Sequence, residues 1–385
     1  MSEYQYYEFQ ALDRPLTQEQ MSKLRAYSSR AQITPRSFVN EYNWGDFKGN
    51  PCQWMEQYFD AFLYFANWGS RRFMLRLPAK LLDPKTTSFY CAGQNLSCQQ
   101  KDGHIILSFE AELEDYEWQE EERSWLASLV PIRSDLMRGD HRALYLGWLL
   151  AVQFQEIRDD APEPPMPPGL GKLNAPLDCL ADFLGIDPDL IAAAAERSPD
   201  HQVSIASKKE VGDWVRTLPS AEKDTIVARL IDGGDPHLSA EVRQRAIREI
   251  SGKIRPDKSP VRTAGAIYAR GEALAAERKQ QEAERRAQEK ARRERAEAEA
   301  RKKRLEALAG REYEIWSTVD KLIATKQPKR YDQAVSLVRD LHDLAEMQGN
   351  GRDFKSRMGA LQRENSAKST LIERLRKGKL LGGVA

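Results

Sequence analysis

The sequence predicts a multidomain α+β protein: a small N-terminal α+β sandwich, a helical middle domain, a long charged single helix and a C-terminal helical hairpin. Segments of strand and helix length alternate over the first 77 of the 385 residues. Residues 266–309 carry dense charge without an apolar stripe, whereas apolar residues return at helical spacing after Tyr313. We expect domains at 1–160, 177–256 and 313–385, a Pro-rich linker at 161–176 and the charged helix at 257–312.

The N-terminal segments follow the order β-α-β-α-β-β. Thr17 and Gln20 form a capping box that begins the first helix, and Pro51 suits the first turn of the second. Gly69 and Ser70 join the last two strands in a tight hairpin. Strands are expected over residues 4–12, 33–44, 61–67, 71–77 and, antiparallel by default, 104–109. This order is typical of a small sandwich that is ferredoxin-like in outline.

Helices are expected to follow the sheet. Residues 116–154 have helical periodicity with a break near Gly139. Five prolines among residues 161–169 then predict an extended linker, which marks the first domain boundary. Short helices alternate with turns over 177–250. Residues 313–381 are expected to form one or two helical hairpins, with a turn at Gly349.

The charged helix has no core of its own. Residues 270–304 contain 13 Lys or Arg against 8 Glu, and after Leu274 the only apolar side chain before Leu305 is Ala. Pairs of Glu and a base four residues later, such as Glu282 and Arg286, favour a helix. A coiled-coil seam would consist of small residues, so a solvated single helix is the prediction.

Composition limits the compartment and the partners. The net charge of +1 hides local segregation, since residues 110–122 carry eight acids and no base. The N-terminus lacks the pattern of a signal peptide, and the longest apolar run, 143–152, is too short to cross a bilayer. Four scattered cysteines do not form a disulfide framework. We therefore expect a cytoplasmic protein with no membrane partner.

Several stretches carry a family resemblance. The segments YQYYEFQALDRPLT, SFVNEYNWGDFKGNP, WVRTLPSAEKDTIVARLIDGGDPHL and YDQAVSLVRDLHDLAEMQG resemble a family of bacterial hypothetical proteins. The C-terminal element also resembles the tail of some bacterial SWIM zinc-finger proteins. The finger itself is absent, because no CxC pairs with a CxH in this chain. The resemblance therefore implies a domain order, and neither zinc nor DNA binding is carried over.

Two tryptophan turns and a run of bases are the candidate binding residues. Asn-Trp-Gly occurs twice, around Trp44 and Trp68, with bases close to both. Core or turn packing is the favoured interpretation, most clearly for Trp68, and a base-stacking surface is the alternative. The candidate residues are Trp44, Lys48, Trp68, Arg71, Arg72, Arg292, Arg293, Arg295, Arg301, Lys302, Lys303 and Arg304.

No motif predicts catalysis or metal binding. Cys91, Cys98 and His104 could supply three soft metal ligands, with Cys52 as a possible fourth. Their spacing is not that of a structural zinc knuckle. Half-buried thiols are the simpler interpretation. The histidines form no HExxH motif, and no Gly-x-Ser-x-Gly elbow is present. We expect no cofactor, no metal and no small-molecule ligand.

The sequence therefore favours a non-enzymatic protein-interaction or scaffold protein that presents helical domains on a charged helical arm. A nucleic-acid-associated factor, which would use the basic helix and the Trp/Arg surface, is the alternative. An enzyme with an unrecognised site is the second alternative. The salt dependence of binding to duplex and single strands distinguishes the first two.

Overall fold

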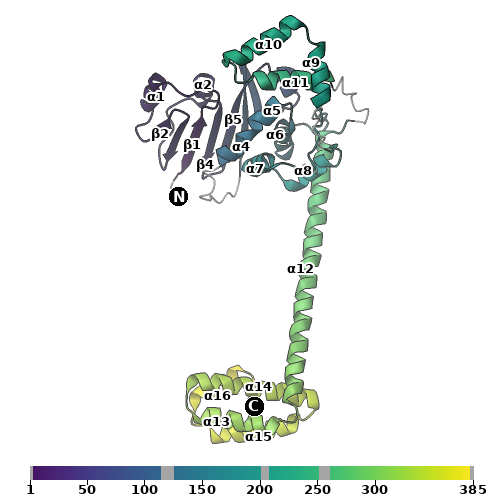
Figure 1. Cartoon of the computed structure of the whole chain (residues 1–385). Coiled ribbons are helices and arrows are strands. Elements are labelled where there is room, and N and C mark those ends of the chain that lie inside the picture. The colour runs from purple at the N-terminus through teal and green to yellow at the C-terminus, as the bar shows by residue number, and fades with distance from the viewer. Residues whose placement is uncertain (1–2, 114–124, 201–207, 251–260, 382–385) are drawn as a thin grey trace. The chain divides into compact units, whose positions relative to one another are not determined.

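The computed structural model describes residues 3–113, 125–200, 208–250 and 261–381 (Figure 1). The chain divides into two compact units, Met1–Arg278 and Lys279–Ala385, and each is described by itself. The expected helix over 116–124 and the expected boundary near residue 256 lie outside the described residues.

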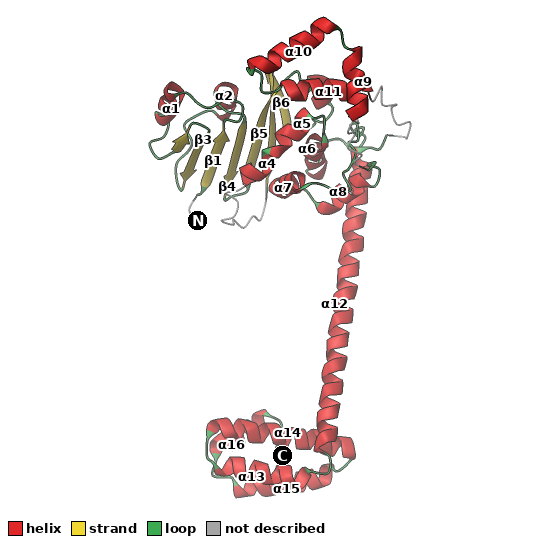
Figure 2. Cartoon of the chain, viewed as in Figure 1, coloured by secondary structure: helices red, strands yellow, loops and turns green. Residues whose placement is uncertain are grey.

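The first unit contains an antiparallel sheet (Figure 2). Its strand order is β2-β3-β1-β4-β5-β7-β6, and every pair among the described strands is antiparallel. The broad α+β prediction is therefore confirmed. The strands are β1 Gln5–Gln10, β2 Gln32–Thr34, β3 Ser37–Tyr42, β4 Ala61–Ala66, β5 Ser70–Pro78, β6 Leu96–Lys101 and β7 His104–Glu112.

The hairpin of β4 and β5 and the antiparallel strand β7 agree with the sequence. The single strand expected over 33–44 is instead the two strands β2 and β3. They separate at Pro35, which cannot donate to a ladder, and a turn forms there in which Thr34 Oγ1 lies 2.7 Å from Ser37 Oγ. Strand β6 was missed, because its residues after Leu96 are mostly polar and lie at the sheet edge.

Two short helices connect the first strands. The capping box of α1 (Gln18–Arg25) is confirmed, since Thr17 Oγ1 accepts from Gln20 N and Gln20 Oε1 accepts from Thr17 N. Helix α2 (Pro51–Gln57) links β3 to β4 around β1, as in a split βαβ unit. A ferredoxin-like fold has two such units. Here α1 leads instead into the β2–β3 hairpin, which lies directly beside β1.

Both faces of the sheet are covered. Helices α1 and α2 enclose an aromatic core that contains Phe9, Phe38, Trp54 and Phe62. Helices on the opposite face share a second core with the alternate residues of β5, such as Phe73. The elements around this second core are α3 Pro84–Ser88, α4 Trp125–Leu129, α5 Pro131–Met137, α6 Arg142–Gln153, α7 Ala175–Leu184 and α8 Pro188–Ala195.

The prolines at 161–176 do not separate two domains. Tyr90 Oη donates to the Pro165 carbonyl at 2.7 Å, and Glu163 N donates to the Arg262 carbonyl at 2.9 Å. Leu170 is buried in the same core as the sheet, as are α7 and α8. The segment expected as a linker is therefore an ordered connection inside the first unit. Proline composition alone does not distinguish these cases, because packing depends on partners distant in sequence.

Three helices after α8 form a small group: α9 Lys208–Thr217, α10 Ser220–Asp232 and α11 Leu238–Ile250. Their own core is small, with Trp214, Leu218 and Ala246 as its buried residues. Polar contacts attach the group to the sheet region. Lys80 Nζ lies 2.9 Å from Asp235 and 2.8 Å from Glu241.

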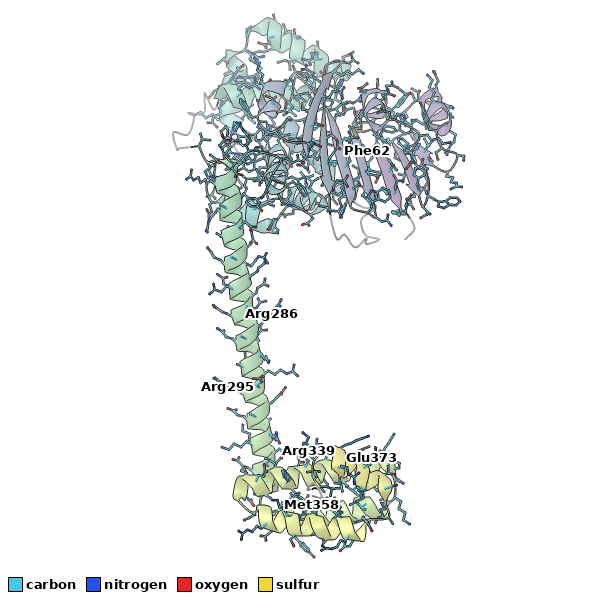
Figure 3. All side chains as sticks on the ribbon, turned by 180° about the vertical axis from the view of Figure 1, so that it is seen from behind. Phe62, Arg286, Arg295, Arg339, Met358 and Glu373 are labelled. Atoms are coloured by element: carbon cyan, nitrogen blue, oxygen red, sulfur yellow. The ribbon has the colours of Figure 1, made fainter. Side chains whose placement is uncertain are left out.

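The predicted long helix is confirmed as α12 (Ala264–Leu308). Its first turns belong to the first unit, where Ile267 is fully buried and Arg278 pairs with Asp189 at 2.8 Å. In the second unit most of its side chains are exposed, and Arg286 and Arg295 point away from the helix axis (Figure 3).

The second unit also contains α13 Glu312–Ala324, α14 Pro328–Gln348, α15 Gly351–Glu364 and α16 Ser369–Lys377. They share a core that includes Val319, Val338, Met358 and Leu371. The expected turn between helices is confirmed at Gly349, which ends α14 with a φ of +75°.

Candidate interaction surfaces

The two Asn-Trp-Gly turns lie on either side of β1. Tyr42 and Ala66 both pair with Gln5, so each tripeptide begins one residue after the same level of the sheet. Gln5 Nε2 donates to the Gly45 carbonyl at 3.1 Å, and Tyr4 N donates to Asn67 Oδ1 at 2.9 Å. The repeated tripeptide therefore makes a pair of turns at one end of the sheet.

The prediction that these tryptophans are core residues is wrong. Trp44 is 78% exposed and Trp68 is 47% exposed. Each follows the last residue of its strand by two positions, on a turn that leaves the sheet. Trp68 Nε1 donates to Ser70 Oγ at 2.8 Å, which holds the indole near the turn. Packing at a turn, which the favoured interpretation also included, fits Trp68, and the base-stacking surface stays a prediction.

The bases expected beside the tryptophans do not form a basic surface. Arg71 is buried, donates to the Phe183 carbonyl at 2.6 Å and lies 4.5 Å over the Trp125 ring. Arg72 pairs with Glu110 at 3.1 Å. Their side chains point to opposite faces of β5. Arg71 is buried, and Arg72 is half-buried with its charge already paired. The spacing along the chain does not reveal this burial.

Lys48 is exposed near the first turn, together with Asp46. At the second turn, Ser70 Oγ donates to Glu112 Oε2 at 2.6 Å. The described charges near the tryptophans therefore include acids, and they lack the cluster of cations that binding to a phosphate backbone requires.

Some of the basic residues of α12 form ion pairs within the second unit. Arg301 and Arg304 form ion pairs with Asp343 and Asp340 of α14. These two pairs have the same three-residue spacing on both helices. Arg293 pairs with Glu297 at 2.8 Å, and Lys302 lies 3.8 Å from Glu306. The remaining predicted bases, Arg292, Arg295 and Lys303, are exposed.

The second unit contains a cleft that the sequence analysis did not identify. It has a volume of about 740 Å³ and lies between α13, α14 and α15. Leu341, Leu344 and Phe354 are buried and form its floor. Trp316 lies at its wall, 5.8 Å from the Phe354 ring, and Tyr313 is 88% exposed at its edge.

The cleft is acidic. Glu312, Asp320 and Asp353 line it, together with one base, Arg357. Arg357 is already paired with Asp320 at 2.6 Å and lies 5.6 Å over the Trp316 ring. The backbone N–H of Gly310 donates to Glu312 at 2.9 Å and lowers the pKa of that carboxyl, so it is ionised at neutral pH. A ligand with a cationic side chain next to an aliphatic one suits this cleft. The cation would lie beside the acids and over an aromatic ring, and the aliphatic side chain would contact the apolar floor.

One sequence signal was available for this cleft. Tyr313, Trp316 and Asp320 recur at spacings of three and four, so they share one face of α13. Val319 and Ile323 form the buried face of the same helix. Trp316 packs against the same core, so the apolar face of α13 continues from Val319 and Ile323 toward the exposed Tyr313. A face wider than the core it covers is the signal that the sequence offered.

Cys52, Cys91, Cys98 and His104 do not gather at one site, although Cys91 and Cys98 are neighbours. Cys52 accepts from Arg72 Nη2 at 3.3 Å on the face covered by α2, whereas Cys91 and Cys98 pack against the opposite core. A hydrogen bond between the Cys91 and Cys98 thiols lowers the pKa of Cys98 and raises that of Cys91. His104 Nδ1 lies 2.9 Å from the Asp102 carbonyl. Within the described ranges, no three His, Cys, Asp or Glu side chains are grouped to hold a metal ion.

Comparison of the chain with protein-family models, curated proteins and solved structures finds no match. The resemblance noted from the sequence stays a prediction. In the part of the chain that the structure describes, no helix has the length and apolarity to cross a lipid bilayer.

Proposed function

We propose that this chain is a protein-interaction protein whose C-terminal helices bind a basic segment of a partner protein. The observation that carries the proposal is the cleft between α13, α14 and α15, with a buried apolar floor, the half-buried Trp316 at its wall and the exposed Tyr313 at its edge. A peptide that fills it would replace water over Leu341, Leu344 and Phe354, and burial of such surface is the main favourable term in association.

The charge of the cleft selects the partner. Three acids face it, and its one base is already paired with Asp320. An acidic peptide would be repelled by the Glu312 and Asp353 carboxylates, whereas a lysine or arginine would lie near both acids and over an aromatic ring. The partner segment is therefore basic, with aliphatic residues between the bases. In this proposal the first unit and the charged arm form the scaffold that carries the cleft.

Two matched peptides test the proposal on the full chain. Both have the same leucines, and their charged positions are all lysine in one and all glutamate in the other. Fluorescence anisotropy is expected to show binding of the lysine peptide alone. Tyr313→Ala and Trp316→Ala are each expected to weaken it about tenfold or more, as for central aromatic contacts. Equal binding of both peptides contradicts the proposal.

Two controls locate the binding. Asp353→Asn is expected to weaken the lysine peptide, whereas Glu314→Gln, on α13 but outside the cleft, leaves it unchanged. Trp44→Ala removes a tryptophan of the first unit that is 78% exposed and is also expected to leave binding unchanged. Loss of binding in Trp44→Ala would move the site to the tryptophan turns.

The exposed arm residues Arg292, Arg295 and Lys303 favour the nucleic-acid alternative. That function requires binding of duplex or single strands that falls steeply with salt. Under our proposal, charge reversal of Arg292 and Arg295 leaves peptide binding unchanged. A steep salt dependence that disappears in the same variant would favour the alternative.

A further inference from the structure

Helix α10 leaves its apolar side uncovered. None of its 13 residues, Ser220–Asp232, is buried. Leu230 is 66% exposed and Ile231 is 81% exposed, and Val227 is also exposed beside them. These three side chains form a ridge along one side of the helix, here called the α10 ridge. A surface helix normally buries such a stripe against a core.

An apolar groove lies next to the ridge. It has a volume of about 560 Å³ and is formed by α9, α10 and α11. Leu230 of the α10 ridge also lines it, so the ridge and the groove adjoin at this residue. The other lining residues include Val211, Val215, Ile226 and Val242, and Arg243 is the one charged side chain among them. The groove and the α10 ridge belong to the same three helices, so one copy of the chain presents both halves of a self-complementary surface.

The groove is on the side of α11 that faces away from the sheet. Glu241 bonds to Lys80, and Gln244 Nε2 donates to the Leu81 carbonyl at 3.0 Å. Arg243 and Ala246, which line the groove, lie on the other side of the same helix by its 3.6-residue period. The attachment of α11 to the sheet therefore leaves the groove open.

The charges match the same surface. Asp224 precedes Val227 by three residues and Ile231 by seven, so it lies beside the α10 ridge. Asp224 and Arg243 are both exposed, and across the described residues neither has an ion-pair partner within 4.0 Å. Other bases of the group are paired, such as Arg229 with Asp235 at 2.6 Å.

We propose that a second copy of this chain covers this surface. The α10 ridge of each copy enters the groove of the other about a two-fold axis, and Asp224 of each copy pairs with Arg243 of the other. A two-fold interface uses the same patch on both subunits, which is the arrangement that a ridge and a groove on one element allow. The dimer buries Leu230 and Ile231 and enlarges the small core of α9, α10 and α11.

Sedimentation velocity of the full chain over a wide range of concentrations tests the proposal. Wild type is expected to be a dimer. Leu230→Asp is expected to be a monomer with an unchanged circular dichroism spectrum, because Leu230 is exposed within one copy. Val261→Asp, at another exposed valine, is expected to stay a dimer. A monomeric wild type overturns the proposal. A Leu230→Asp variant that is still a dimer also overturns it, because a dimer formed through a coiled coil of α12 would not depend on Leu230.

A charge exchange tests the pairing itself. Asp224→Arg and Arg243→Asp are each expected to raise the dissociation constant of the dimer about tenfold, because each places like charges together. The double variant restores opposite charges and is expected to dimerise about as well as wild type. If the double variant loses as much dimerisation free energy as the two single variants together, the pairing of Asp224 with Arg243 is overturned.

Discussion

The guanidinium of Arg262 lies 2.8 Å from the carboxylate of Glu163, and both side chains are at most one-tenth exposed. Arg262 also donates to the carbonyls of Ala193 and Ala194 at 2.8 and 2.9 Å. This pair joins three segments: the proline-rich connection, the end of α8 and the residues just before α12. It is one of the contacts that hold residues 161–169 in the first unit, together with the hydrogen bond from Tyr90 to the Pro165 carbonyl.

Glu163→Ala is expected to lower the free energy of unfolding by about 3–5 kcal/mol, because it leaves the buried Arg262 charge without its acid. Urea denaturation followed by tryptophan fluorescence measures the loss. The matched control is Glu196→Ala, whose pair with Arg270 is at the surface, and its expected cost is below about 1 kcal/mol. Equal losses in the two variants would show that Glu163 is not buried as described.

Gly69 and Gly45 occupy corresponding turns, but the room for a side chain differs between the two positions. Both have positive φ, +102° and +84°. A Cβ at Gly69 would lie 1.9 Å from the Leu113 carbonyl oxygen, whereas a Cβ at Gly45 meets nothing within 4 Å. Gly45→Ala is expected to cost about 1 kcal/mol from backbone strain alone. Gly69→Ala is expected to cost about 3 kcal/mol or more, because the backbone must also move. Thermal melts that show the reverse order contradict the turn geometry.

Asp13 predicts a pH dependence of stability. Its carboxylate accepts from Arg133 at 2.8 and 2.6 Å and lies 2.9 Å from His237 Nε2. Burial raises the pKa of Asp13, but the hydrogen bonds from His237 and Arg133 outweigh it and hold the pKa well below its usual range. The folded pKa is thus below the unfolded value of about 4, so the stabilisation is complete above pH 4 and is lost as the pH falls toward the folded pKa.

Asp13→Asn is therefore expected to lower the free energy of unfolding by about 3 kcal/mol at neutral pH, because Arg133 loses its anionic partner. The difference from wild type should shrink as the pH falls below about 4. Urea denaturation at a series of pH values measures it. The exposed pair of Glu19 and Lys23 offers the control, since Glu19→Gln should show no comparable change. A difference that is constant with pH would contradict the role of ionised Asp13.

Trp44 and Trp54 provide a matched comparison of the exposed surface and the core. Trp54 is buried among Phe9, Phe38 and Phe59, and Trp54→Ala is expected to cost about 3–5 kcal/mol by leaving a cavity. Trp44→Ala is expected to leave the melting temperature nearly unchanged. Differential scanning calorimetry compares them, and a large loss in Trp44→Ala would restore the core interpretation.

Features whose cause lies within a few residues could be predicted from the sequence. Thr17 and Gln20 are three positions apart, and the helix they begin is where the capping box predicts it. The turn at Gly69 and the uninterrupted helix over 264–308 have equally local causes. The candidate site was predicted less well. The exposed arm bases follow from composition, but the cleft requires α13, α14 and α15 to meet across separate turns.

The sequence by itself determined the position of most elements, because capping, turns and helical pairing act between neighbours along the chain. Only the tertiary structure decided which of them share a core. Arg71 is buried and donates to a carbonyl more than 100 positions away in the sequence, whereas Trp68, three residues before it, is exposed. The proline-rich segment around Glu163 is held by the ion pair with Arg262. Burial depends on which distant surfaces meet, and the residues around a position in sequence do not specify that.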